Sequence, residues 1–256
     1  MDERDPTRFY DDLAGSYDRM FADWAASSRR QGEVLHALLE QHLGPGPHRV
    51  LDCAAGIGTQ TLGLLAHGHR VAASDVSLRA LRRARELTPP SGPRPGLAAA
   101  DMRVLPFAGG CVDAVVCADN AVPHLLTDDD LAAALGGMRR VTRAGGLLLL
   151  TVRDYDALRA ERPRLTEPQL SEGEDGLVVT LQVWHWDRDG ERYDLDHLQL
   201  RQDGAGWHLA ARGTRYRALG REQLTAAATQ AGWADVRWLP PGPEGYYQPV
   251  LVARAA

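Results

Sequence analysis

The chain has 256 residues, a hydrophobic content of 44% and a formal net charge of −5, which suit a globular protein of one large domain or of one domain with a modest insertion. An acidic balance gives no overall basic field, so we expect no nucleic-acid partner. All 29 basic residues are arginines, which excludes any mechanism that needs a lysine Schiff base or a lysine general base.

The cysteines and the apolar runs indicate the compartment. Cys53, Cys111 and Cys117 form no CxxC pair and lie in or near apolar runs, so we interpret them as buried free thiols in a reducing environment. The longest aliphatic run, around 147–150, has the length of a strand and not of a membrane span. The start of the chain mixes charges of both signs, unlike a signal peptide. We therefore expect a cytoplasmic protein with no membrane contact.

Predicted helices and strands alternate along most of the chain. The apolar periodicity predicts helices over 9–21, 28–41, 59–67, 77–87, 128–141 and 221–230, and strands near 49–54, 70–75, 97–101, 112–118, 146–152, 234–239 and 247–253. This order is typical of an α/β fold with a doubly wound, Rossmann-like sheet. We expect seven strands, mostly parallel, with the last strand antiparallel.

The pattern changes after residue 153. Three strands are predicted, joined by turn-like segments at 187–190 and 203–206, and they cover 177–186, 193–201 and 207–217. Such an antiparallel meander is foreign to a doubly wound sheet, so we expect an insertion that covers the site. The predicted organisation is an N-terminal helical lid over 1–45 and a Rossmann-like domain over 46–256, with the β insertion at about 177–217.

The segment 50–60, VLDCAAGIGTQ, predicts a nucleotide site. An apolar strand ends near Asp52, and the chain then turns through Gly56 and Gly58 into a helix. Gly56 permits a sharp turn, and Gly58 lacks the Cβ that would keep backbone N–H groups from a ligand. Asp75 follows the next predicted strand, 19 residues beyond Gly56, the distance at which a βαβ unit presents a carboxylate to a ribose diol.

The residues around this turn favour one type of nucleotide. Thr61 stands where a dinucleotide site usually has a third glycine. The Asp52 carboxylate would repel a pyrophosphate and attract an ammonium group. S-adenosylmethionine, with an amino group and no diphosphate, fits this pattern, and a nicotinamide oxidoreductase is disfavoured. An ordinary βαβ turn whose acids only cap helices is the structural alternative.

Over nearly its whole length the chain resembles the class I S-adenosylmethionine-dependent methyltransferases, and within them the glycine/sarcosine N-methyltransferase-like enzymes. The resemblance rests on four segments: 9–18 (FYDDLAGSYD), 51–60 (LDCAAGIGTQ), 74–77 (SDVS) and 101–102 (DM). It implies that residues 9–18 close over the cofactor, that Asp75 binds the ribose hydroxyls, and that Asp101 and the Met102 N–H meet the adenine. The residues expected at the cofactor are Tyr17, Arg30, Asp52, Ala54, Gly56, Gly58, Asp75, Val76, Asp101, Met102 and Asp119. Arg30 is matched to an arginine on the cofactor carboxylate, with Arg29 an equally available neighbour.

The resemblance also implies residues at the methyl acceptor. Asn120 and His124 follow the fourth predicted strand, and Arg153 follows the fifth, at the edge where open α/β sheets bind ligands. They match residues near the substrate in that family, where the arginine grips the substrate carboxylate, and we predict these three as catalytic and acceptor-binding residues. Tyr193 and Tyr216 are further candidates for the acceptor pocket. The chain departs from the family at Asp154, which places a further carboxylate beside the site.

These residues predict methyl transfer to a small molecule. A sulfonium needs little acid–base assistance, because alignment with the acceptor lowers the barrier, and His124 or water can take the proton that an amine must lose. We predict N-methylation of an amine that carries a carboxylate. The alternatives are O- or C-methylation of a secondary metabolite, which a large apolar pocket would favour, and a non-catalytic S-adenosylmethionine-binding protein.

Two groups of potential metal ligands need a separate interpretation. They are His67 with His69, and His197 with Asp194 and Asp196. Neither group has further ligands at suitable spacing, so we expect solvated side chains and no metal. The oligomeric state does not follow from the sequence.

Overall fold

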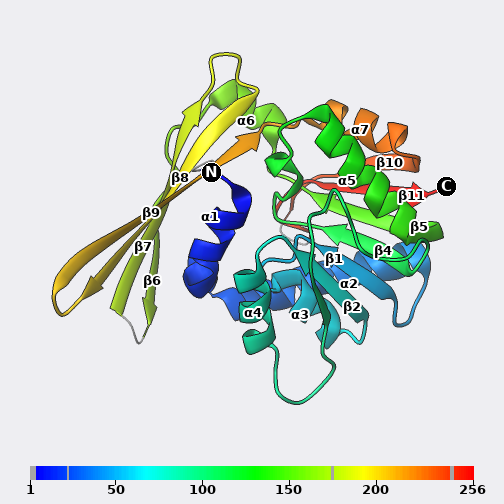
Figure 1. Cartoon of the computed structure of the whole chain (residues 1–256), viewed down its shortest axis with the longest axis horizontal. Helices are drawn as coiled ribbons and strands as arrows, with labels where there is room; N and C mark the ends of the chain where they lie inside the picture. The colour runs from blue at the N-terminus through cyan, green and yellow to red at the C-terminus, as the bar shows by residue number, and fades with distance from the viewer. Residues whose placement is uncertain (1–3, 22, 174–175, 243–244) are drawn as a thin grey trace.

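The computed structural model describes residues 4–21, 23–173, 176–242 and 245–256. It contains a seven-stranded sheet of order β10-β11-β5-β4-β1-β2-β3 and a separate four-stranded sheet of order β6-β7-β8-β9 (Figure 1). The strands are β1 (Arg49–Cys53), β2 (Arg70–Asp75), β3 (Gly96–Ala99), β4 (Val112–Cys117), β5 (Thr142–Thr151), β6 (Gln169–Gly173), β7 (Gly176–Trp186), β8 (Arg192–Asp203), β9 (Gly206–Arg217), β10 (Trp233–Leu239) and β11 (Val250–Ala255). The helices are α1 (Pro6–Leu13), α2 (Trp24–Leu43), α3 (Thr59–Ala66), α4 (Leu78–Leu87), α5 (Asp128–Val141), α6 (Tyr155–Glu161) and α7 (Arg221–Gln230), with 3₁₀ turns η1 (Ala14–Met20) and η2 (Val122–His124).

The large sheet confirms the predicted Rossmann-like topology. Strands β1 to β5 pair in parallel, whereas β11 is antiparallel to both β5 and β10. Its central strands, β1 and β4, are apolar and almost wholly buried, because helices cover both faces of the sheet. Helix starts are fixed by side-chain caps: Asp23 for α2, Ser77 for α4 and Thr127 for α5.

Helices α2 and α3 approach each other unusually closely on one face of this sheet. A Cβ added to Gly32 would lie 2.5 Å from the Cα of Gly63, and a Cβ added to Gly63 would lie 2.5 Å from the Ser28 carbonyl oxygen. Fully buried leucines of both helices, Leu35, Leu39 and Leu64, belong to the same core. Helix α2, which the sequence predicts as part of the lid, is thus part of the layer that covers the large sheet. Within the predicted lid, α1 and η1 are the elements that lie outside this layer.

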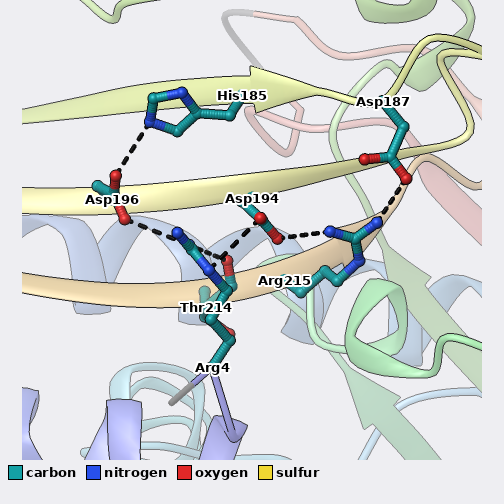
Figure 2. Close-up of polar contacts among 7 residues, drawn as sticks. All are labelled: Arg4, His185, Asp187, Asp194, Asp196, Thr214 and Arg215. Atoms are coloured by element: carbon teal, nitrogen blue, oxygen red, sulfur yellow. Dashed lines mark hydrogen bonds and ion pairs between the residues drawn. The ribbon is translucent and has the colours of Figure 1, made fainter. Parts of the chain in front are cut away.

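The small sheet stands to one side of the large sheet, with α1 between them (Figure 1). Burial alternates along β8, so Leu195 and His197 face inward while Asp194 and Asp196 face the other way. Arg4 reaches those two carboxylates, with its Nε 3.4 Å from Asp194 and its Nη1 3.2 Å from Asp196 (Figure 2). It passes the edge strand β9 at Gly213, where an added Cβ would lie 3.1 Å from Arg4 Nη1.

The structure corrects several sequence predictions. The helix expected over 9–21 ends at Leu13 and continues as the 3₁₀ turn η1. The predicted three-stranded meander has a fourth strand, β6, and a short helix, α6, precedes it. Sequence periodicity missed both because β6 is a short edge strand and α6 has only 7 residues. No helix within the described ranges is both long and apolar enough to cross a membrane.

Candidate functional site

The glycine turn after β1 is held by Asp75, at the end of β2. The Asp75 carboxylate accepts hydrogen bonds of 2.8 Å from the backbone N–H groups of Gly56 and Ser77. Gly56 has φ +55° with open space around it, as expected for a sharp turn. Gly58 has φ +87°, and a Cβ there would meet the Cβ of Ala84 at 3.2 Å. The glycine at 58 therefore serves the backbone conformation and the contact with α4, a reason different from ligand access.

Three adjoining cavities lie along the carboxyl edge of the large sheet. The central cavity lies at the glycine turn and Asp75 and measures about 70 Å³. The outer cavity, about 250 Å³, extends past Asp101, and the large cavity, about 430 Å³, extends under the small sheet. Ala54, Val76, Met102 and His124 line both the central and the outer cavity, whereas Tyr10, Tyr17 and Asp119 line both the central and the large cavity. Together they form an elongated cleft.

Asp101 lies in the outer cavity with its carboxylate already paired. Arg103 Nη2 lies 2.5 Å from the Asp101 carboxylate, and the same guanidinium contacts Asp130 at 2.7 Å. The hydrogen bonds from Arg103 lower the pKa of Asp101, so this carboxyl stays ionised. An ionised carboxylate still has lone pairs free to accept a further donor.

Asp119 is the carboxylate at the boundary between the central and large cavities. Its oxygens accept hydrogen bonds from Gln60 Nε2 at 2.7 Å, from the Tyr246 hydroxyl at 2.6 Å and from the Tyr247 hydroxyl at 2.7 Å. Burial raises the pKa of Asp119, against the lowering effect of these donors. Asp119 and Asn120 both have positive φ, 56° and 70°, so the chain turns sharply here to present both side chains at the cleft.

Arg153 presents a cation to the large cavity with neutral partners. Its Nη1 donates to the Tyr193 hydroxyl at 2.9 Å and its Nη2 donates to Gln182 Oε1 at 3.0 Å. The guanidinium carbon lies 4.7 Å above the Trp184 ring and 5.6 Å above the Tyr216 ring. Among the described residues, no carboxylate forms an ion pair with Arg153. The guanidinium is therefore oriented but not neutralised.

Asn120 adds a second donor beside this cation. Its Oδ1 accepts a 3.2 Å hydrogen bond from the Arg153 backbone N–H. Its Nδ2 is buried near the Tyr193 hydroxyl but makes no hydrogen bond of normal geometry in the described part of the chain. Asp154, the carboxylate that the sequence places next to the site, instead caps α6 and pairs with Arg221 at 2.6 Å. It therefore does not compete for Arg153.

His124 lies at the central and outer cavities and not at the large one. Its Nε2 is 3.0 Å from the Tyr10 hydroxyl, and its ring lies against Tyr216 with centroids 4.2 Å apart. Burial lowers the pKa of His124 to about 3, so the ring is neutral at neutral pH. A neutral imidazole with so low a pKa is a weak proton acceptor.

Three predicted side chains, and the backbone of Gly58, lie outside the three cavities. Asp52 is 1% exposed and accepts a 2.5 Å hydrogen bond from the Thr61 hydroxyl. Arg30 is exposed on α2 and lines a separate surface hollow with Tyr246 and Tyr247. Tyr193 is fully buried and acts behind Arg153. The remaining predicted cofactor and acceptor side chains, except Gly58, line the cleft.

Sequence reasoning assigned no role to several residues that the fold brings into the cleft. They are Gln60, Gln182, His197 and Tyr247, whereas Tyr246 donates to Asp119 without lining any of the three cavities. The pair of adjacent tyrosines, Tyr246 and Tyr247, precedes the last strand in the sequence, but no local pattern connects it to Asp119. The two metal groups also differ from expectation, because His69 and His197 are each 1% exposed and not solvated.

Comparisons with known proteins agree with this architecture. A family model described as a methyltransferase domain matches residues 50–146. The chain is similar to a glycine/sarcosine N-methyltransferase of Parasynechococcus marenigrum, with 32% identity over 59% of this chain and 52% of the relative. It is also similar to a demethylmenaquinone methyltransferase of Mycobacterium sp. (strain KMS), with 31% identity over 64% of this chain and 69% of the relative. The chain thus spans about half the length of the glycine/sarcosine relative and two thirds of the other.

A solved structure shares the fold over the full length. The CcbJ methyltransferase of Streptomyces caelestis superposes with a TM-score of 0.78 at 21% identity, covering 100% of both chains. The match includes the large sheet, the small sheet and the N-terminal helix. Because the methyltransferase-domain model covers the glycine turn and the chain is 31% identical to a methyltransferase of which it covers 69%, the chain belongs to the S-adenosylmethionine-dependent methyltransferases, whose methyl donor is S-adenosylmethionine.

Proposed function

We propose that this protein methylates the amine nitrogen of a small molecule that carries a carboxylate. The observation that carries the proposal is Arg153, a guanidinium held by neutral side chains in a cavity of about 430 Å³. The unpartnered Asn120 Nδ2 lies beside it. A carboxylate accepts from both donors and neutralises the cation, and the guanidinium fork fixes its orientation.

The cleft fits the proposed donor from one end to the other. The open space at Gly56 and the Asp75 carboxylate in the central cavity suit a ribose, and Val76, Asp101 and Met102 at the outer cavity suit an adenine. At the opposite end Asp119 suits an ammonium group, because a buried carboxylate with a raised pKa gains most from a nearby cation. We thus assign to Asp119 the ammonium contact that the sequence had suggested for Asp52.

The chemistry asks the protein mainly for alignment. S-adenosylmethionine supplies, when bound, a methyl group on a positively charged sulfur. Tyr10, Tyr17 and Asp119 line both the central and large cavities and stand at the boundary between donor and acceptor. Proximity and orientation of this kind contribute about 7–11 kcal/mol. In this proposal His124 orients the Tyr10 hydroxyl, and a water molecule accepts the proton that the amine loses.

One observation favours a second candidate, methylation of an apolar metabolite. Phe9, Leu13, Met20, Phe21 and Leu181 line the same cavity, and one relative is named for a quinone substrate. An apolar acceptor would leave the Arg153 charge without a counter-ion and Asn120 Nδ2 without a partner, which is costly for buried polar groups. This cost favours the carboxylate-bearing amine.

The test is a methyl-transfer screen of amino acids, amines and phenols, followed by a comparison of the best acceptor with its methyl ester. We expect the free acid to react much faster than the ester. Arg153→Ala should lower kcat/KM for the acid by a factor that corresponds to about 2–5 kcal/mol of transition-state stabilisation. Arg153→Lys should retain only part of this stabilisation, because lysine lacks the planar fork of the guanidinium. The affinity for S-adenosylhomocysteine, measured by calorimetry, should be unchanged in both variants. An ester that wild-type protein methylates as fast as the acid would contradict the proposal and favour the apolar metabolite.

A further inference from the structure

The large cavity contains a buried imidazole that no contact explains. His197, on β8, is 1% exposed and lines the large cavity. Neither of its ring nitrogens has a hydrogen-bond partner in the described ranges of the chain. A buried polar group without a partner costs stability, so such a group in a cavity indicates a partner that the protein itself does not supply.

The position of His197 relative to Arg153 follows from the strand register. His197 lies directly opposite Gln182 on β7, and Gln182 Oε1 accepts the hydrogen bond from Arg153 Nη2. Side chains directly opposite in an antiparallel pair have Cβ atoms about 4.5–5.5 Å apart. Gln182 thus lies between the two residues: it pairs with His197 across the strands and accepts the hydrogen bond from Arg153. Like Arg153, His197 lines the large cavity and neither the central nor the outer one, so it lies on the acceptor side of the cleft.

The protonation state of His197 determines what it can recognise. Burial and the positive charge of Arg212, on the neighbouring strand β9, lower the pKa of His197 to about 4. The ring is therefore neutral at neutral pH, with one N–H donor and one acceptor nitrogen. A hydroxyl group matches this pair, because it both accepts and donates.

We propose that His197 forms a second acceptor subsite that binds a hydroxyl group, so that the natural acceptor is a hydroxylated amine larger than glycine. The inference deepens the proposed function and rests on methyl transfer at this cavity. Between the two polar ends the cavity wall is apolar at Phe9, Leu13 and Leu181. The acceptor class is an amino acid with its amine at the donor boundary, its carboxylate on Arg153, an apolar body and a terminal hydroxyl on His197.

The experiment uses two matched pairs of probes, tyrosine with phenylalanine and tyramine with phenethylamine. In each pair the two compounds differ only in the para hydroxyl group of the aromatic ring. Binding to the protein loaded with S-adenosylhomocysteine is measured by calorimetry, and methyl transfer is measured separately. Wild-type protein should favour the hydroxylated member of each pair by about tenfold or more, because a site built to hydrogen-bond a hydroxyl rejects the analogue that lacks it.

Variants of His197 separate recognition from a structural role. His197→Phe should abolish the preference by weakening only the hydroxylated probes, and His197→Asn, which keeps a donor and an acceptor, should restore part of it. His185→Phe is the matched control and should change neither, because His185 lies on β7 with its ring exposed and paired with Asp196 (Figure 2). Equal loss for both members of a pair in His197→Phe, or no hydroxyl preference in wild-type binding, overturns the subsite. If tyrosine shows no advantage over tyramine while the hydroxyl preference persists, the carboxylate proposal fails and the subsite stands.

Discussion

At the scale of single residues, two buried carboxylates that the sequence treats alike have different surroundings. Asp52 faces the Thr61 hydroxyl inside the protein, and its Oδ1 has no partner among the described residues. Asp119 faces the cleft with three hydrogen-bond donors. Burial, together with the charges of Asp119 and Asp75 and against the lowering effect of the Thr61 hydrogen bond, raises the pKa of Asp52 to about 7. Asp52 is therefore a cost to stability when ionised.

This cost predicts the pH dependence of an Asp52→Asn variant. The unfolded carboxyl titrates near pH 4 and the folded one near pH 7, so the folded state binds the proton more tightly and wild-type stability falls as pH rises between these values. Asparagine keeps an acceptor for Thr61 without the charge. Urea unfolding without cofactor should show that the variant's stability relative to wild type increases from pH 5 to pH 8 by more than about 1.4 kcal/mol, the value of one pKa unit.

Asp113→Asn is the matched control for this measurement. The Asp113 carboxylate is paired with Arg49 at 3.2 Å and with Arg143 at 2.7 Å, and these hydrogen bonds hold its pKa below the usual range against the effect of burial. Asp113 is therefore ionised in both states at pH 5 and at pH 8, and its variant should be destabilised equally at both. A constant difference between Asp52→Asn and wild type across this range would show that Asp52 titrates normally.

At the scale of elements, the contact between α2 and α3 fixes the glycine turn. Ser28 Oγ donates to the Thr59 carbonyl at 2.7 Å, and Trp24 Nε1 donates to Thr59 Oγ1 at 3.0 Å. Both bonds hold the first residue of α3, directly after the turn. Backbones can approach this closely only because residues 32 and 63 are glycines.

Alanine at Gly63 should therefore destabilise the protein, although alanine is the better helix former. An unhindered Gly→Ala change inside a helix gains about 1 kcal/mol, whereas forcing a methyl group into a packed contact costs about 1–3 kcal/mol. Gly136, in α5, has nothing within 4 Å of an added Cβ, so Gly136→Ala should be stabilising. Thermal unfolding of the two variants should shift in opposite directions. Stabilisation of both would mean that α2 and α3 separate without cost.

At the scale of the whole molecule, the N-terminal segment joins the two sheets over the cleft. Pro6 and Tyr10 line the central cavity. On one side Arg4 is held by Asp194 and Asp196 of the small sheet (Figure 2), and on the other Ser77 Oγ donates to Asp11 at 2.6 Å. Residues 4–11 therefore cover the cavity proposed for S-adenosylmethionine, and the contacts that hold this segment to the two sheets include few and partly exposed ones.

Arg4→Ala should speed the release of S-adenosylhomocysteine by about two- to thirtyfold, because each of its two partly exposed ion pairs contributes about 0.2–1 kcal/mol. Stopped-flow dissociation measures this rate. Arg8→Ala is the control, since Arg8 lies on α1, the helix that follows Arg4, and forms its ion pair within that helix, with Asp12 at 3.8 Å. Equal dissociation rates for wild type and Arg4→Ala would show that these ion pairs do not limit opening.

The sequence by itself determined the features that depend on local pattern. The strands of the large sheet and the helices between them, the turn at Gly56 and the position of Asp75 follow from apolar periodicity and glycine spacing, and the structure has them in the predicted order. Asn120 and Arg153 were also placed correctly at one edge, because the carboxyl ends of parallel strands meet there.

Only the tertiary structure decided which polar side chains face the cleft. Tyr247 reaches Asp119 across 128 positions of the chain, and His197 is buried because the small sheet turns one face toward the large cavity. Alternation along a strand tells which residues share a face, but not what covers that face. The difference between Asp52 and Asp119 likewise depends on burial and on donors from distant segments, which no local pattern encodes.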